Sequence, residues 1–401
     1  MSSHCNPSVV DDGLVFLYDV EDIQSYKGEP TVNLATDSPS QGGWAGGREV
    51  LDSSRKKFRF IVNNFNGSAG SGQGWRSFTW DLNSYSGQSV TISATVEVPS
   101  ASSGTFAWVM MGQTNTHTSN NSGAGQYMGY SAASERVSKS TTTTEHITWT
   151  GTVGSTGTAS QPSGHVGFTL WYNGGTIGVD SYVEVSNVQV EINSHATQFV
   201  NGTRSATQGL LDRTGTSTIN ISNASFDSNA QMTFDGTDDY INDASFDMGT
   251  PTDITLECII RFNGSLDSAD RKVMHYNKTG GTNAVFQLRK GNSASRLMYQ
   301  AHNGSQWYTM TDTDAIESDT WAHFMITHSG TSAIMYKNGV QSATATMGNL
   351  HWTNANNLLI GYRANSEYWK GDIPIMKIYN RALTSTEVLQ NFNSTKSRFG
   401  L

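Results

Sequence analysis

The sequence predicts an all-β protein with two antiparallel β-sandwich domains, one inserted in the other, and one short C-terminal helix. Apolar and polar residues alternate with a period of two wherever the pattern is clear, as in 90–98, whose apolar residues share one face. Charged residues are only 15% of the chain, and 40 of its 401 residues are Gly, a composition typical of loop-rich β proteins. This length suits two or three domains, each with its own core.

Two local signals mark strand irregularities and turns. In segment 182–192 the apolar phase slips by one residue at Ser186–Asn187, which predicts a β-bulge. Asn338–Gly339 stands between two apolar runs. Both residues tolerate positive φ, so the pair predicts a type I′ hairpin.

One segment has the periodicity of a helix. Thr384 and Glu387 form a capping box, and Val388, Leu389 and Phe392 follow on one side. We expect this helix to close one end of a sandwich.

Charge and cysteine content exclude several classes of function. The net charge is −9, and the only basic cluster is 55–57, so a nucleic-acid partner is not expected. No apolar run approaches the roughly 20 residues that span a bilayer, and no export signal is present, so we expect synthesis in a cytoplasm without membrane insertion. Cys5 and Cys258 fit neither a disulfide framework nor a zinc pattern, and Cys258 is interpreted as a buried small apolar residue.

Several segments of the C-terminal half carry a resemblance to a known family. They are 232–242, 254–262, 321–327, 333–340, 358–362 and 371–383. In this order and spacing they resemble the laminin-G-like, concanavalin A-type lectin jelly roll. The resemblance implies a two-sheet antiparallel sandwich that binds carbohydrate or protein surfaces more often than it catalyses.

The domain boundaries follow from a second resemblance. Residues 9–35 resemble the strand that opens such a sandwich in tailed-phage and other viral structural proteins. The intervening part has its own strands and resembles a carbohydrate-binding-module jelly roll. We therefore expect segment 1–37 to pair with a lectin-like domain at 195–401, and 38–194 to be a module inserted between them.

Three short stretches resemble large structural proteins of marine and cyanobacterial phages. They are 25–30, the junction 194–205 and the tail 387–400. The resemblance implies a virion protein made in the host cytoplasm, with other virion proteins as partners. It also favours a homo-oligomer, a trimer, although the sequence contains no coiled-coil heptads.

No catalytic residue is predicted, and the protein is not expected to be an enzyme. Jelly-roll glucanases carry a Glu-x-Asp-x-Glu strand that points two carboxyl groups into one cleft, and the sequence lacks it. Asp19, Glu21 and Asp22 come nearest and are interpreted as a solvated turn. His323 and His328 are five residues apart, which places them on opposite faces of a strand rather than at one metal site.

Calcium is the only cofactor with any support, because many laminin-G-like domains hold Ca²⁺ at a rim. Hard cations need several carboxylate or carbonyl oxygens. The candidate ligands are Asp235, Asp238 and Asp239 around Gly236, with a second acidic group at Asp312, Asp314 and Asp319. Turn chemistry is the favoured explanation of both groups, so no cofactor is expected and Ca²⁺ remains the alternative.

Glycan binding would use aromatic faces together with amides or backbone groups that orient hydroxyls. The candidates in the lectin-like domain stand in or beside polar loops and are Trp307, Tyr308, Trp352, Tyr362, Tyr368 and Trp369. In the inserted module they are Trp108 and Tyr127, which flank the long polar loop 112–125. Alternation alone does not rank these aromatic residues.

The sequence therefore indicates a non-enzymatic phage structural protein: a fibre, a tail appendage or a capsid decoration. The favoured function is host attachment, in which weak contacts to host-surface carbohydrate are multiplied over many copies. The alternatives are a purely architectural or cementing protein, and a depolymerase acting on envelope polysaccharide.

Overall fold

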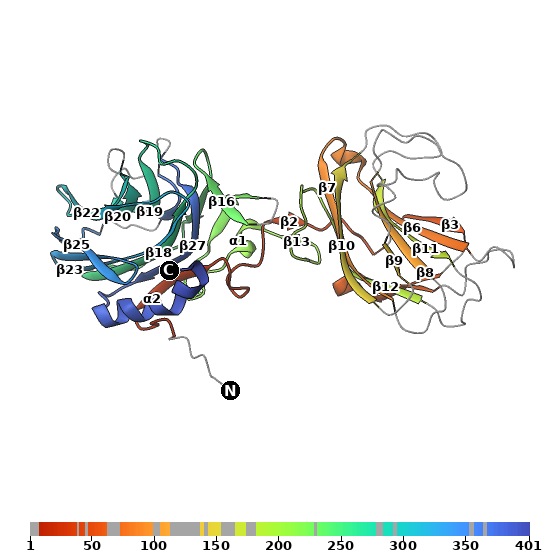
Figure 1. Ribbon diagram of the computed structural model, residues 1–401, viewed down its shortest axis with the longest axis horizontal. Helices are drawn as coiled ribbons and strands as arrows, with labels where there is room; N and C mark the ends of the chain where they lie inside the picture. Colours follow the sequence, from red (N-terminus) through yellow and green to blue (C-terminus); the bar gives the residue numbers. More distant parts are fainter. Residues whose placement is uncertain are drawn as a thin grey trace. The chain divides into compact units, whose positions relative to one another are not determined.

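The computed structural model describes residues 8–37, 40–44, 47–61, 73–98, 105–112, 137–139, 143–153, 165–173, 182–227, 231–277, 284–291, 295–352, 357–363 and 367–401. The chain divides into two compact units (Figure 1): unit 1 is Met1–Pro30 with Ser205–Leu401, and unit 2 is Thr31–Arg204. Nearly all the regular structure is antiparallel β-sheet, which confirms the predicted fold class. Among the described residues, no helix has the length and apolarity to cross a membrane.

Unit 1 contains an eight-stranded sheet. Its order is β15 (Ser225–Phe226), β16 (Met232–Asp235), β27 (Lys370–Tyr379), β18 (Asp253–Phe262), β23 (Trp321–Ser329), β24 (Ser332–Lys337) and β25 (Val340–Thr346), with β1 (Leu14–Asp19) also on β27. The strand β1 pairs in antiparallel register with β27, from Leu14 opposite Tyr379 to Asp19 opposite Ile375. The N-terminal segment thus adds a strand to the C-terminal unit.

The second sheet of unit 1 has seven strands. Its order is β14 (Asn220–Asn223), β17 (Tyr240–Asp243), β26 (Asn357–Ile360), β19 (Arg271–Asn277), β20 (Ala284–Lys290), β21 (Arg296–His302) and β22 (Trp307–Ala315). A single turn of helix, α1 (Ala206–Gly209), precedes β14. One apolar core lies between the two sheets, with Leu256 and Phe324 from one sheet and Phe286 and Tyr299 from the other.

The predicted hairpin and histidine positions in unit 1 are confirmed. Asn338 and Gly339 have φ of 52° and 77° and join β24 to β25. On β23, His323 bonds Glu257 on the outer face, whereas His328 bonds Tyr299 in the core. Cys258 is buried in the same core, also as predicted.

The helix α2 (Ser385–Phe399) begins with the predicted capping box. It lies along the outer face of the eight-stranded sheet (Figure 1) rather than closing an end of the sandwich, so that expectation was wrong. Val388 packs on Met325 and Tyr336 near one end of the helix, and Phe399 packs on Ile259 and Ile375 near the other.

The buried face of α2 also differs from the predicted one. Leu389 is 47% exposed, and the buried position is instead Asn391. The reason is polar: Asn391 donates from Nδ2 to the buried Glu257 carboxylate at 2.7 Å. A hydrogen bond to a buried charge is costly to lose, and it fixes the rotation of the helix.

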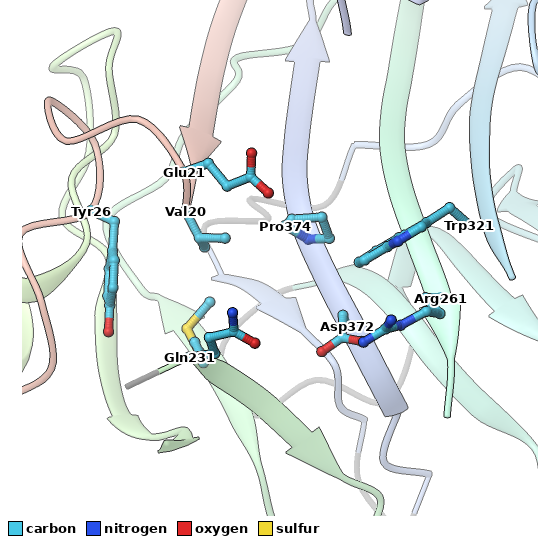
Figure 2. A pocket seen from close by; sticks show the side chains of 9 residues that line it. Val20, Glu21, Tyr26, Gln231, Arg261, Trp321, Asp372 and Pro374 are labelled. Carbon is cyan, nitrogen blue, oxygen red and sulfur yellow. The ribbon is translucent and has the colours of Figure 1, made fainter. Parts of the chain in front are cut away.

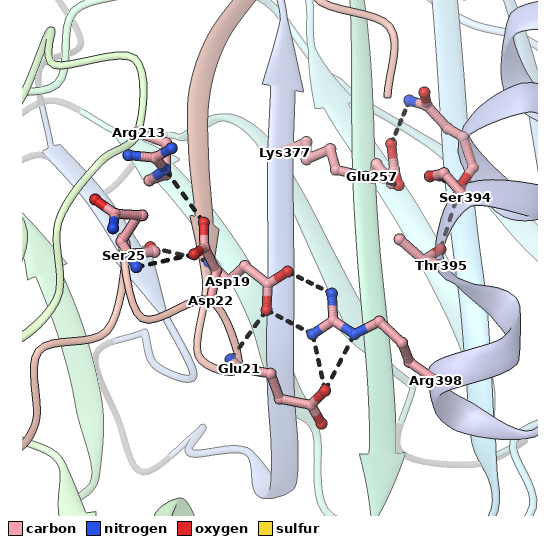
Figure 3. Close-up of polar contacts among 12 residues, drawn as sticks. Asp19, Glu21, Asp22, Ser25, Arg213, Glu257, Lys377, Ser394, Thr395 and Arg398 are labelled. Carbon is pink, nitrogen blue, oxygen red and sulfur yellow. Dashed lines mark hydrogen bonds and ion pairs between the residues drawn. The ribbon is translucent and has the colours of Figure 1, made fainter. Parts of the chain in front are cut away.

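The acidic turn after β1 is tied to the end of α2 (Figure 3). Arg398 contacts Asp19 at 2.6 Å and Glu21 at 2.9 Å. Asp22 pairs with Arg213 at 3.3 Å. The segment is a turn, as predicted, but all three of its carboxylates are ion-paired rather than simply solvated.

Unit 2 is a sandwich of two five-stranded sheets. One has the order β10 (Thr143–Thr152), β7 (Ser89–Val98), β12 (Tyr182–Glu191), β5 (Lys57–Ile61) and β4 (Gly47–Asp52). The other is β3 (Ser40–Trp44), β6 (Gln73–Asp81), β11 (His165–Asn173), β8 (Thr105–Gly112) and β9 (Val137–Lys139). Short elements are β2 (Thr31–Val32) paired with β13 (Thr203–Arg204), and the 3₁₀ turns η1 (Ser53–Arg55) and η3 (Asn83–Tyr85).

The core of unit 2 includes Trp80 and Val166 from one sheet and Ile92 and Val190 from the other. The predicted bulge is confirmed, because the pairing of β12 with β7 shifts register after Ser186, and Asn187 has φ of 52°. This bulge returns the later apolar residues of β12 to the core face.

Candidate functional site

The outer face of the seven-stranded sheet carries a polar groove of about 260 Å³. It is lined by Asp270, Lys272, Gln287, Arg289, Gln300, Trp307 and Arg363. Phe286, Leu288 and Tyr299 point into the core. Because side chains alternate along a strand, Gln287 on β20 and Gln300 on β21 project to the opposite face.

Five charged side chains in and beside the groove form an alternating row, which we call the charge ladder. Arg289 contacts Asp270, and Lys272 lies 3.3 Å from Asp270 and 3.2 Å from Glu367. Arg363 lies 3.7 Å from Glu367. The Lys272 side chain is only 1% exposed, and this burial lowers its pKa despite the two carboxylates. The ladder has a cation at each end.

Several buried polar atoms of the groove have no hydrogen-bond partner within the described part of the chain. They are Gln287 Oε1, Arg289 Nε and Asp270 Oδ1. The Gln287 amide donates from Nε2 to Gln300 Oε1 at 2.6 Å, so one half of this amide is satisfied and the other is not. Each such atom costs about 1–3 kcal/mol unless water or a ligand bonds to it. The groove thus offers unused hydrogen-bond donors and acceptors to a polar ligand.

His275 borders the groove, because it lies opposite Gln287 in the pairing of β19 with β20. Its side chain is buried, and neither ring nitrogen has a hydrogen-bond partner among the described residues. Burial, aided by the charges of Arg363 and Lys272, lowers the pKa of His275 to about 3. The imidazole is therefore neutral at physiological pH and offers one donor and one acceptor.

Trp307 is the predicted aromatic residue that lines this groove. It is half-buried, and its ring meets His302 edge to face with ring centroids 5.1 Å apart. The two residues face each other across β21 and β22. Trp307 therefore adds an aromatic surface to a groove of amides and charges.

Tyr362 and Tyr368 form a stack with Tyr240, which the sequence analysis did not select. The ring centroids of Tyr362 and Tyr368 are 4.6 Å apart, and those of Tyr240 and Tyr362 are 4.7 Å apart. All three rings are half-buried. Tyr362 contacts a ring on each side, so Tyr240 and Tyr368 are the better candidates for contact with a ligand.

Three other predicted aromatic residues serve packing. Trp369 is fully buried and meets Phe262 edge to face, so its selection as a glycan contact was wrong. Trp352 donates from its indole nitrogen to the Pro251 carbonyl at 2.9 Å and packs at the margin of the core. Tyr308 also packs against that core.

The two candidates in unit 2 remain untested as glycan contacts. Tyr127 lies outside the described residues, as does most of the polar loop 112–125 beside it. Trp108 belongs to β8, where it pairs with Leu170 and Val137. Only its backbone is described, so its role stays a prediction.

The three aspartates predicted as calcium ligands do converge. Asp235, Asp238 and Asp239 each offer an oxygen within 4.8 Å of the others. Much of this capacity is already used within the turn. Both oxygens of Asp239 accept hydrogen bonds, from Ser225 Oγ and from the Asp235 backbone N–H, each at 2.7 Å. Burial, and then the two neighbouring carboxylates, raise the pKa of Asp239.

The second predicted acidic group does not assemble. In the described parts of the chain, the first group is the only set of three such side chains close enough to share an ion. Asp312 is buried, whereas Asp314 and Asp319 are exposed. Asp319 instead accepts the Gly264 backbone N–H at 2.8 Å.

A smaller hollow of about 190 Å³ lies in the eight-stranded sheet region of unit 1 (Figure 2). Arg261 is bonded to Asp372 at 2.8 Å and lies 4.6 Å from the centre of the Trp321 ring. Glu21 is held by Arg398. Because Arg261, Asp372 and Glu21 are all ion-paired, this hollow offers a ligand fewer unused charged groups than the groove does.

Sequence reasoning found Trp307 but missed the groove's polar residues. The available signal was the alternation in β20 and β21, where polar and charged residues occupy the positions between core residues. The charge ladder left no local signal, because Asp270 and Glu367 are almost one hundred residues apart in the chain.

Comparison with known proteins agrees with the fold. A family model described as the concanavalin A-like lectin/glucanases superfamily matches residues 235–389, which include every residue that lines the groove. No curated protein matches the chain.

Among solved structures, the Trypanosoma rangeli sialidase is similar at 15% identity and a TM-score of 0.36, over 47% of this chain and 31% of that chain. The botulinum neurotoxin type G receptor binding domain is similar at 15% identity and a TM-score of 0.36, over 46% of this chain and 48% of that chain. The chain thus spans less than half the length of these structures. Residues 235–389 are thus similar in sequence to the concanavalin A-like lectin and glucanase superfamily, over less than half of the chain.

Proposed function

We propose that unit 1 binds a saccharide in the groove on the outer face of the seven-stranded sheet. The observation that carries this proposal is the combination of Trp307 with buried polar atoms that have no partner within the described residues. An aromatic face packs on the apolar side of a sugar ring, and a few fixed polar groups orient its hydroxyls.

The unpartnered atoms match hydroxyl groups in kind. Arg289 Nε is a donor, while Gln287 Oε1 and Asp270 Oδ1 are acceptors. A hydroxyl group both donates and accepts, so a polyhydroxylated ring satisfies all three. A purely apolar ligand would leave each of them desolvated at a cost of about 1–3 kcal/mol.

We further propose that the protein acts in host attachment as a phage virion component, a fibre, tail appendage or capsid decoration. This part rests on the sequence resemblance of 25–30, 194–205 and 387–400 to phage structural proteins. Many copies on one particle, in a homo-oligomer or beside other virion proteins, would turn weak glycan contacts into firm adhesion. The architectural reading predicts the same fold but no ligand.

A polysaccharide depolymerase is less well supported by the groove. Its two carboxylates, Asp270 and Glu367, each contact two cations of the charge ladder. Both carboxylates are thus held in ion pairs, whereas glycoside cleavage needs two carboxyl groups that flank the scissile bond. We therefore propose binding without bond cleavage.

The test is a glycan array with the full chain, followed by calorimetric titration of the best glycan. Trp307→Ala is expected to weaken binding at least about tenfold, or 1.4 kcal/mol. Trp321→Ala is the matched control, because Trp321 is also a half-buried tryptophan of unit 1 but lines the other hollow. Thermal melts of both variants separate lost binding from lost folding.

The outcomes distinguish glycan binding in the groove from the architectural role and from the depolymerase. An array without any signal would support the architectural role. Equal losses in both tryptophan variants would remove the groove as the site. Release of reducing sugar from host polysaccharide would restore the depolymerase.

A further inference from the structure

We infer that the groove takes a saccharide that carries an anionic group, a carboxylate or a sulfate, bound at the Arg289 end of the charge ladder. This inference rests on the proposed saccharide binding and specifies its ligand class. It is carried by the charge balance of the ladder and by the free hydrogen-bonding capacity of Arg289.

The ladder is not neutral. It contains Arg289, Lys272 and Arg363 against Asp270 and Glu367, which leaves one positive charge in a chain whose net charge is −9. Lys272 at the centre is shared by both carboxylates. Arg289, at one end, contacts only one carboxylate of the ladder, Asp270.

Arg289 is the end that faces the proposed ring site. Its side chain is 18% exposed and lines the groove, and it contacts Asp270 through Nη1. Its Nε is buried and has no hydrogen-bond partner among the described residues. A guanidinium edge with an unused N–H favours an ionised acceptor, because charge-assisted hydrogen bonds are roughly twice as strong as neutral ones.

The positions on the sheet connect this charge to the ring site. Gln287 and Arg289 are two residues apart on β20, so they share a face at a spacing of roughly 7 Å. Gln300 lies directly opposite Gln287 on β21. A sugar ring beside the two glutamines would thus place an acidic substituent within reach of Arg289.

The neighbouring histidine does not supply a competing charge. His275 is buried next to this row and is kept neutral by burial and by Arg363 and Lys272. An anion in the groove therefore meets the cations of the ladder and a neutral imidazole.

The test compares matched glycans on the full chain by calorimetric titration at low salt. The carboxylate pair is oligogalacturonate and its methyl ester, and the sulfate pair is dextran sulfate and dextran. At least one acidic member is expected to bind about tenfold or more tightly than its neutral partner, since a hydrogen bond to a charged group adds about 1.5–3 kcal/mol. The pair that shows the preference identifies the anionic group.

Arg289→Gln is expected to reduce that ratio to below about twofold, and Arg289→Lys, which keeps the charge, to retain part of it. Arg213→Gln is the matched control: it removes one positive charge from an arginine of unit 1 that lines neither hollow and should leave the ratio unchanged. Thermal melts establish that each variant is folded.

Three outcomes would overturn the inference. If acidic and neutral members bind equally, the groove binds saccharides without charge preference and the proposed function survives. If the acidic preference persists in Arg289→Gln, or falls equally in Arg213→Gln, the anion is bound elsewhere or by general attraction. If no member of either pair binds while neutral glycans bind on the array, the anionic class is wrong.

Discussion

Replacing Glu257 tests how unit 1 holds the helix α2 on its outer face. Three donors converge on the buried carboxylate of Glu257. They are Lys377 Nζ at 2.5 Å, Asn391 Nδ2 at 2.7 Å and His323 Nε2 at 3.2 Å. An ionised carboxylate only accepts, so His323 must carry its proton on Nε2. Figure 3 shows Glu257 and Lys377 on neighbouring strands beside the helix.

The substitution Glu257→Gln keeps the shape but removes the charge and one acceptor oxygen. The amide has one oxygen for three donors, so Lys377, which is buried, loses its counter-charge. Breaking one side of a buried ion pair costs about 3–5 kcal/mol. The pKa of Glu257 leads to a similar free-energy cost. Burial opposes ionisation of Glu257, but Lys377 and His323 outweigh it and lower the pKa from 4.5 to about 2. This difference corresponds to roughly 3 kcal/mol.

The same reasoning fixes the pH dependence. The pKa of Glu257 is lower in the folded protein than its ordinary 4.5. Its contribution is therefore present in full above about pH 4.5 and is lost as the pH falls from there towards 2. The wild type should lose stability over this range by roughly 3 kcal/mol more than Glu257→Gln does.

The assay is urea unfolding of the full chain at pH 7 and pH 3.5, where about 1.4 kcal/mol, somewhat less than half of this difference, should already appear. Arg213→Gln is the control for an exposed ion pair, which should cost less than about 1 kcal/mol. The double variant Glu257→Gln/Lys377→Met should recover much of the loss, because no unpaired charge stays buried. A loss below about 1 kcal/mol in Glu257→Gln, or a double variant as unstable as the two single losses combined, would refute the reasoning.

Two further predictions concern the backbone at Gly371 and the aspartate cluster of Asp235, Asp238 and Asp239. Gly371→Ala should cost more than about 2 kcal/mol in urea unfolding, because φ is +136° and a Cβ would lie 2.0 Å from the Arg261 carbonyl oxygen. Gly249→Ala has positive φ but no atom within 4 Å of the new Cβ, so it should cost only about 1–2 kcal/mol, and equal losses would contradict the clash argument. Calcium should leave the melting temperature unchanged, since both Asp239 oxygens are already bonded; a rise that Asp238→Asn removes would instead establish a calcium site.

Local backbone features were predictable from the sequence because the residues that cause them lie next to one another in the chain. The bulge at Ser186–Asn187 follows from a phase slip within one strand, and the hairpin at Asn338–Gly339 follows from two residues that tolerate positive φ. The capping box at Thr384 is equally local. Each signal lies within a few residues of the structure it specifies.

The errors concern contacts between distant parts of the chain. The sequence placed Leu389 on the same side of the helix as Val388 and Phe392. In the structure Asn391 is buried on that side instead, because it donates a hydrogen bond to Glu257 on β18. Trp369 was predicted to stand in or beside a polar loop, but it packs on Phe262 in the core. Alternation tells which residues share a face of a strand, and the partner that covers that face comes from elsewhere in the chain.

The two outer faces of unit 1 differ in a way that favours binding over a purely architectural role. On the eight-stranded sheet, α2 covers Glu257, and both of its oxygens accept hydrogen bonds. On the seven-stranded sheet, Gln287 and Arg289 keep buried polar atoms that have no partner in the described part of the chain. Because each unsatisfied atom costs about 1–3 kcal/mol, a spacer would gain from apolar residues at these positions, whereas a saccharide site needs the atoms that are left unpaired.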